Sequence, residues 1–211
     1  SLREAIIGRA KARAALKESG GGPGRTKDGK AVQLLANVGK VEDAVKAAKE
    51  DVEGVGLFRT EVLFLERKTA PTVEEQTKSY TEVFRAFGDR KVVIRTLDAG
   101  ADKPLAFAPS EEEENPALGV RGLRMDKRFP QLLDDQLTAI AAAAKATDAK
   151  VWVMAPMVST VHEAAAFEQR VKSHGLPVGG IMIEVPAAAL RGTHLIEKVD
   201  FFSIGTNDLT Q

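Results

Sequence analysis

The stretch that decides the fold is Phe201-Phe202-Ser203-Ile204-Gly205-Thr206-Asn207-Asp208-Leu209-Thr210-Gln211. Its apolar, aromatic first part is typical of a buried strand, which Gly205 ends. Directly after this break, Thr206, Asn207 and Asp208 offer a hydroxyl, an amide and a carboxylate. A strand that delivers polar side chains at its carboxyl end is typical of the active sites of α/β enzymes.

Upstream of this stretch, predicted strands alternate with predicted helices. The strand candidates lie at 32–36, 54–58, 91–96, 151–155, 180–183 and 201–204. The helix candidates between them lie at 41–50, 71–87, 131–147, 161–174 and 187–198. Each strand-and-helix unit spans about 30 residues, which is the period of a βα repeat and favours a parallel sheet.

The predicted fold is α/β, of the (β/α)8 TIM-barrel type, with about six βα units present. A complete barrel of this type takes about 250 residues, so this chain of 211 residues is short by about two units. An open doubly wound sheet is the alternative, but it gathers its polar residues at one switch point. Here the polar residues follow different strands, which favours a barrel mouth: Asn37, Arg59, Arg95, Glu184 and the pair Asn207 and Asp208.

The first thirty residues are interpreted as a separate arm. A helix is predicted over 2–18, followed by a Gly-rich break at 19–24. We therefore expect a connecting helix and linker at 1–30 and an incomplete barrel domain at 31–211. A start without Met, and an end three residues after Asp208, lead us to expect a fragment of a larger protein.

Composition excludes several classes of function. Thirty basic residues balance thirty acidic ones, so no overall field recruits nucleic acid or an anionic membrane. The sequence has no Cys, which excludes disulfides and thiolate sites within it. It shows neither a membrane-spanning run nor a signal peptide, so we expect a soluble, cytoplasmic protein. Any anion-binding site must be local.

Two arginines at strand ends predict an oxyanion ligand. Arg59 and Arg95 each follow an apolar run, and a guanidinium presents donors in a rigid fork that suits phosphate or carboxylate. The alternative is that they simply pair with Glu61 and Asp98, which lie two and three residues away. Two such residues at one end of a barrel favour the ligand.

Two carboxylates at other strand ends predict a metal. Glu184 and Asp208 could hold Mg²⁺, which takes one or two carboxylates and completes its shell with water and phosphate. The alternative makes Glu184 a helix cap and Asp208 a turn residue. Lys103 and Arg121, on the loop after the third strand, could cover the site or could be solvated. The glutamates at 111–114 are interpreted as a solvated loop.

Five motifs, in this order, resemble the enzyme I family of the bacterial sugar phosphotransferase system, the phosphoenolpyruvate–protein phosphotransferases. They are Gly-Val-Gly-Leu-Phe-Arg-Thr-Glu-Val-Leu-Phe-Leu at 54–65, Val-Ile-Arg-Thr-Leu-Asp-Ala-Gly-Ala-Asp-Lys at 93–103, Glu-Asn-Pro-Ala-Leu-Gly-Val-Arg-Gly-Leu-Arg at 114–124, Ile-Met-Ile-Glu-Val-Pro-Ala-Ala at 181–188 and Asp-Phe-Phe-Ser-Ile-Gly-Thr-Asn-Asp-Leu-Thr-Gln at 200–211. The resemblance runs from about residue 32 to the end of the sequence.

The resemblance implies a (β/α)8 barrel that binds phosphoenolpyruvate (PEP). In this family the phosphoryl group passes to a histidine on a separate N-terminal domain, then to the carrier protein HPr and on to sugars. By motif position, Arg59 and Arg95 should hold the phosphate, and Asn207 and Asp208 the substrate. Glu184 and Asp208 should hold Mg²⁺, and Lys103 and Arg121 match positions that line the same pocket.

The resemblance also places essential groups outside this sequence. The phosphorylated histidine lies upstream, and a further substrate-binding arginine and the acid cysteine lie downstream. We therefore expect no complete catalytic cycle here, and we expect a homodimer, because the C-terminal domain of the family mediates dimerisation. Alternatives are a sister enzyme, pyruvate phosphate dikinase or PEP synthase, or a non-catalytic ligand-binding or dimerisation module. Phe58 and the Gly-Ala-Asp-Lys stretch favour enzyme I.

Overall fold

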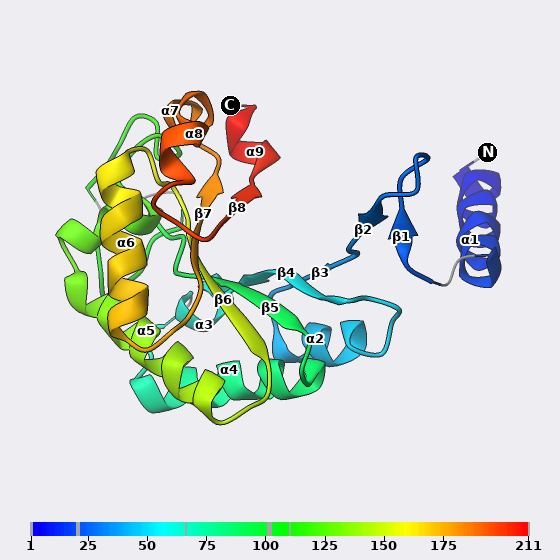
Figure 1. The fold of residues 1–211 in the computed structure, drawn as a ribbon, viewed down its shortest axis with the longest axis horizontal. Coiled ribbons are helices and arrows are strands. Elements are labelled where there is room, and N and C mark those ends of the chain that lie inside the picture. Colours follow the sequence, from blue (N-terminus) through cyan, green and yellow to red (C-terminus); the bar gives the residue numbers. More distant parts are fainter. Residues whose placement is uncertain (1, 20–21, 66, 101–102, 110, 211) are drawn as a thin grey trace.

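The computed structural model describes residues 2–19, 22–65, 67–100, 103–109 and 111–210. Its centre is a curled, parallel six-stranded sheet in the order β3-β4-β5-β6-β7-β8, which forms a half-barrel (Figure 1). The strands are β3 (Ala36–Val38), β4 (Gly54–Arg59), β5 (Lys91–Arg95), β6 (Lys150–Ala155), β7 (Gly179–Ile183) and β8 (Phe201–Ile204). The sequential order and the curl confirm the prediction of a TIM-barrel type fold with about six units.

Helices cover the outer, convex face of this sheet (Figure 1). They are α2 (Val41–Ala47), α4 (Val73–Phe87), α5 (Pro130–Lys145), α6 (Val161–Ser173), α7 (Pro186–Leu190) and α8 (Gly192–Leu195). Three further short elements lie in the connections that follow strands β4, β5 and β8: α3 (Glu61–Phe64), η1 (Gly122–Lys127) and α9 (Thr206–Leu209). The starts of α4 and α6 are fixed by capping boxes, in which Thr72 pairs with Glu75 and Thr160 with Glu163.

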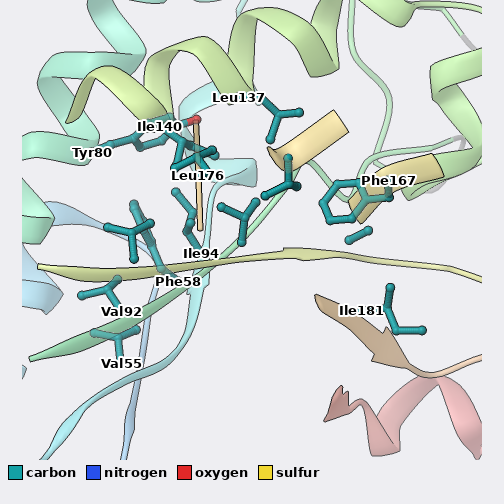
Figure 2. Packing of buried hydrophobic residues seen from close by; sticks show 14 of the residues in the cluster. Val55, Phe58, Tyr80, Val92, Ile94, Leu137, Ile140, Phe167, Leu176 and Ile181 are labelled. Carbon is teal, nitrogen blue, oxygen red and sulfur yellow. The ribbon is translucent and has the colours of Figure 1, made fainter. Parts of the chain in front are cut away.

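The core lies between the outer face and the helices. Alternate strand residues such as Val92, Ile94 and Ile181 point outward and belong to one core cluster with Tyr80, Leu137 and Phe167 of the helices (Figure 2). The inner face carries a smaller apolar cluster of Val93, Met154 and Met182, with Leu57, Trp152 and Phe201 packed against it. This cluster fills the floor of the half-barrel.

The period-two alternation places charged residues directly above this floor. Two residues beyond Val93 the next inward position is Arg95, and two residues beyond Met182 it is Glu184. Both therefore point into the half-barrel at the carboxyl ends of the strands, which is where TIM-barrel sites are built.

Two predicted elements differ from the structure. The strand predicted at 32–36 is wrong in position, because the barrel strand is β3. Residues 31–32 instead form β2 (Ala31–Val32), which pairs antiparallel with β1 (Gly24–Arg25) around a tight turn at 26–30. The helix predicted at 187–198 is interrupted at Arg191 and continues as α8, since Gly192 disfavours an unbroken helix.

Residues 2–19 and 22–30 lie to one side of the half-barrel. Helix α1 (Leu2–Ser19) stands beyond the β1–β2 hairpin and away from the sheet (Figure 1). Gly20 and Gly21 of the predicted break lie outside the described residues, and the domain division at residue 30 stays a prediction. Within the described part of the chain, no helix combines the length and the apolar character that a membrane crossing requires.

Candidate functional site

The carboxyl ends of the strands surround an open cavity of about 500 Å³. It is lined by all seven side chains that the sequence predicts for the site, together with Asn37: Arg59, Arg95, Lys103, Arg121, Glu184, Asn207 and Asp208. Residues from across the whole half-barrel therefore meet at one mouth, as the distribution along the sequence predicted. Their roles in binding stay predictions.

The sheet and its loops deliver these side chains in three ways. Arg59 and Arg95 are the last residues of β4 and β5 and face each other in the strand register. Glu184 follows β7 directly, whereas Asn207 and Asp208 lie on α9 after β8. The long loop between β5 and α5 supplies Lys103 and Arg121.

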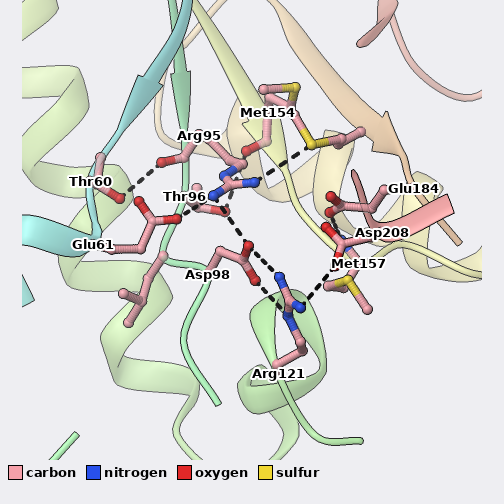
Figure 3. A network of polar contacts seen from close by, with 12 residues as sticks. Thr60, Glu61, Arg95, Thr96, Asp98, Arg121, Met154, Met157, Glu184 and Asp208 are labelled. Atoms are coloured by element: carbon pink, nitrogen blue, oxygen red, sulfur yellow. Dashed lines mark hydrogen bonds and ion pairs between the residues drawn. The ribbon is translucent and has the colours of Figure 1, made fainter. Parts of the chain in front are cut away.

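Arg95 lies in a buried cage of acceptors (Figure 3). Its Nη2 forms ion pairs with Glu61 Oε1 and, at 3.2 Å, with Asp98 Oδ2, and its Nη1 lies 3.6 Å from the Met182 sulfur. The alternative that Glu61 pairs with Arg59 is wrong, because α3 begins directly after Thr60 and turns Glu61 toward β5. The alternative pairing of Arg95 with Asp98 is confirmed.

Arg121 joins the two halves of the mouth (Figure 3). Its Nε and Nη2 donate to the two oxygens of Asp98 at 3.1 and 2.8 Å, and its Nη1 donates to Asp208 Oδ1 at 3.0 Å. Arg121 is buried, so the alternative of a solvated loop arginine is wrong. Burial of Asp98 opposes its ionisation, but the hydrogen bonds from Arg121 and the charge of Arg95 outweigh it and lower its pKa.

Arg59 and Lys103 differ from these caged arginines. Arg59 is exposed and Lys103 is half-buried, yet both line the cavity. Among the ion pairs of the described residues, none involves either side chain. These two cations are therefore free to receive an anionic ligand without first leaving a carboxylate.

Glu184 is held by the backbone of the neighbouring loop. Its Oε1 accepts a hydrogen bond of 2.8 Å from the N–H of Met157, whose side chain is buried. The first residues of α7 receive no side-chain cap, so the alternative of Glu184 as a helix cap is wrong. Burial, with further contributions from the carboxylates of Asp98 and Asp208, raises the pKa of Glu184 to about 7.

The donor set fits a hard divalent cation with few protein ligands. Glu184 and Asp208 bring carboxylate oxygens close together at the cavity, which Asn207 also lines (Figure 3). The described residues contain no group of three or more His, Asp or Glu side chains arranged as a metal cage. Mg²⁺ commonly uses one or two carboxylates and takes its other ligands from water and substrate phosphate, so two carboxylates satisfy this requirement.

Sequence reasoning missed one structural acid. The glutamates at 111–114 were predicted to be solvated, but Glu113 is half-buried, and its two oxygens accept from the N–H of Val120 at 2.9 and 3.2 Å. It thereby anchors the loop just before Arg121. The sequence does not distinguish Glu113 from its acidic neighbours, because its contact with Val120 depends on how the loop folds back.

We expect Gly100→Ala to displace Arg121. An added Cβ would overlap the Arg121 Cβ and stand 3.0 Å from the Val120 carbonyl oxygen, so the backbone has to move. We expect a loss of about 1–3 kcal/mol in the free energy of unfolding, measured by urea denaturation. Gly192→Ala is the control, because its added Cβ would meet only a Phe202 ring atom at 3.8 Å. Equal stability of the two variants would contradict the prediction.

Comparisons with known proteins identify the family that this chain resembles. Residues 13–211 match the family described as "PEP-utilising enzyme, PEP-binding domain". The phosphoenolpyruvate-protein phosphotransferase of Streptomyces coelicolor is 50% identical over 192 residues, which cover 90% of this chain and 34% of that protein. A relative of the same name from Haloferax volcanii is 43% identical over 199 residues, or 88% of this chain and 35% of that protein.

A third relative carries a different name. The multiphosphoryl transfer protein of Xanthomonas campestris is 45% identical over 196 residues, which cover 90% of this chain and 23% of that protein. The chain thus spans about a third or less of the length of these curated relatives.

Proposed function

Because the chain belongs to the family of PEP-binding domains of PEP-utilising enzymes, we propose that its cavity binds phosphoenolpyruvate for phosphoryl transfer. The observation that carries this proposal is the division of charge in the cavity. Arg59 and Lys103, which form no ion pair within the described part of the chain, share it with the carboxylates of Glu184 and Asp208. A bound phosphate could therefore accept hydrogen bonds from the two cations and share a metal ion with the two carboxylates.

The chain's own residues would act by binding and orientation. Arg59 and Lys103 would donate to phosphate oxygens, with Arg95 and Arg121 adding positive charge from their buried ion pairs. Asn207 would donate its amide to the substrate carboxylate. Phosphoryl transfer depends chiefly on positioning and charge neutralisation, which these groups provide. When bound by Glu184 and Asp208, Mg²⁺ would neutralise charge on the phosphoryl oxygens.

The finer proposal concerns the reaction partners. We propose that the phosphoryl group moves to a histidine of a separate domain and then to HPr, in a cytoplasmic homodimer that serves sugar uptake. The names of the relatives, phosphoenolpyruvate-protein phosphotransferase and multiphosphoryl transfer protein, support this reaction over that of a dikinase or a synthase.

Calorimetric titration of PEP into the chain, with and without Mg²⁺, tests the binding proposal. We expect Mg²⁺-dependent binding that Glu184→Ala abolishes, because this variant removes one of two metal carboxylates. Glu197→Ala, which removes an exposed carboxylate outside the cavity, should bind as the wild type does. A folded wild-type chain that produces no binding heat would contradict the proposal.

The transfer proposal needs a second experiment. The chain would be mixed with a separately prepared histidine-bearing N-terminal domain, HPr, Mg²⁺ and PEP, and phosphorylated HPr would be measured. Binding without transfer would support the alternative of a ligand-binding module. Transfer would support an enzyme of the phosphotransferase type.

A further inference from the structure

A buried hydrogen-bonded side chain lies behind the cavity, on the outer side of the sheet. Gln136 of α5 is 1% exposed and lines no part of the cavity mouth. Its Oε1 accepts from the N–H of Leu97 at 2.9 Å. Its Nε2 donates to the Thr60 hydroxyl and to the Tyr80 hydroxyl, both at 3.0 Å. Both donors and the acceptor of the amide are therefore used.

Thr60 carries this constraint to the ends of two strands. It directly follows Arg59 at the end of β4, and its own hydroxyl donates to the carbonyl oxygen of Arg95 at 2.9 Å (Figure 3). One hydroxyl group thus accepts from Gln136 and ties β4 to β5 at the level of the two arginines. A shift of Gln136 would move both strand ends.

Leu97 provides the second tether. It lies between Arg95 and Asp98, where the chain has left the ladder of β5. Its N–H finds its acceptor in Gln136 rather than in a neighbouring strand. The loop that aims Asp98 at Arg95 and Arg121 is therefore fixed from outside the cavity.

Tyr80 and Gln76 anchor the network to α4. The fully buried Tyr80 donates to Gln76 Oε1 at 3.1 Å, and Gln76 Nε2 donates to the Pro71 carbonyl at 3.1 Å. The Tyr80 ring also packs edge-on against Phe58 of β4, with ring centroids 5.9 Å apart. Since buried polar groups are costly to leave unpaired, each bond in this network resists displacement.

We infer that Gln136 is a positioning residue for the PEP site, which rests on the function proposed above. It holds the ends of β4 and β5 in one register through Thr60 and Leu97, and so sets the positions of Arg59, Arg95 and Asp98 in the cavity. It does this without contacting the cavity. A purely structural glutamine would stabilise the fold and leave ligand affinity unchanged.

The chain offers a matched control. Gln76 is equally buried, at 1% exposed, but among the described residues its side chain hydrogen-bonds to Pro71 and Tyr80 and not to Thr60 or Leu97. Gln136→Met and Gln76→Met both replace an amide by an unbranched apolar chain of similar length. Both should lower the denaturant midpoint, whereas only the first should disturb the strand ends.

Two readouts separate positioning from stability. Calorimetry with PEP and Mg²⁺ should show affinity at least 10-fold weaker for Gln136→Met and within twofold of wild type for Gln76→Met. Amide hydrogen exchange at Leu97 should be at least 10-fold faster in Gln136→Met only. Should Gln136→Met not fold, Thr60→Val removes only the hydroxyl branch, and a threefold or greater affinity loss is expected. Equal effects of the Gln136 and Gln76 variants, or unchanged affinity in Thr60→Val, would overturn the inference.

The same experiment distinguishes the two proposals. If the wild-type chain does not bind PEP, the proposed function fails. Amide hydrogen exchange at Leu97 is then the measurement that tests whether Gln136 positions the strand ends. Faster exchange confined to Gln136→Met would sustain the positioning role. Exchange that is unchanged, or equally faster in both variants, would overturn it.

Discussion

Arg59→Ala is expected to weaken PEP binding about 100-fold and to leave the free energy of unfolding within about 0.5 kcal/mol of wild type. Arg59 lines the cavity but is exposed, and no ion pair among the described residues uses it. Its removal therefore breaks nothing in the fold. A charge-assisted, bidentate contact to phosphate is worth about 3 kcal/mol, which is about 100-fold in affinity.

Calorimetry measures the affinity and urea denaturation the stability. Arg85→Ala is the matched control, because Arg85 is an exposed arginine of α4 outside the cavity. Arg59→Lys should fall between wild type and Arg59→Ala, since it keeps the charge and loses the planar fork. If Arg59→Ala and Arg85→Ala bind PEP equally well, Arg59 is not a ligand of the phosphate.

The positions of the site residues could be predicted because the alternation of side chains along a strand follows from a short stretch of sequence. Parallel strands end at one edge of the sheet, and alternation decides which residue points inward. Arg95 and Glu184 each lie two residues beyond an inward-facing apolar residue, so their place in the half-barrel follows from the sequence alone. The same reasoning placed Asn207 and Asp208 beyond the last strand.

Apart from the pairing of Arg95 with Asp98, the partners of these residues could not be predicted, because they depend on turns and loops. Glu61 reaches Arg95 rather than Arg59 only because the chain turns into α3 after Thr60. Arg121 comes from a loop with no periodic signal, yet it bridges Asp98 and Asp208. Sequence distance indicates neither set of contacts, because each depends on how the chain turns after its strand.

Gln136 was missed for a different reason. The predicted helix at 131–147 was interpreted by its apolar content, and Gln136 lies on its buried stripe with Leu133, Leu137 and Ile140. A polar residue on an apolar helix face is a detectable signal, because it has to find partners when buried. The barrel strand at 36–38 could not be recognised from its sequence, because three residues are too few to show a periodic pattern.

Asp98→Asn is expected to lower the free energy of unfolding by about 3–5 kcal/mol. Asp98 is 1% exposed, and its carboxylate compensates the buried guanidiniums of both Arg95 and Arg121. The amide would leave these two positive charges short of a counter-ion in a desolvated place. For a domain of this size, the loss corresponds to a fall of roughly 10 °C in the unfolding temperature.

Asp134→Asn is the matched control for this prediction. Asp134 also pairs with an arginine, Arg170, at 2.8 Å, but its side chain is 43% exposed. Ion pairs that reach solvent contribute about 0–1 kcal/mol, so the unfolding temperature of this variant should stay close to wild type. Inorganic phosphate should stabilise Asp98→Asn more than wild type, because an anion can replace the missing carboxylate charge.

The pH dependence of stability gives an independent check on Asp98. Its pKa is lowered from the ordinary value of 3.8, since the hydrogen bonds from Arg121 and the charge of Arg95 outweigh the effect of burial. A carboxylate with a lowered pKa stabilises the fold above the unfolded-state pKa, and this contribution is lost as pH falls through the folded-state pKa. The stability difference between wild type and Asp98→Asn should therefore narrow below about pH 4. A difference that stays constant down to pH 2, with the protein still folded, would mean that the charge of Asp98 does not stabilise the two arginines.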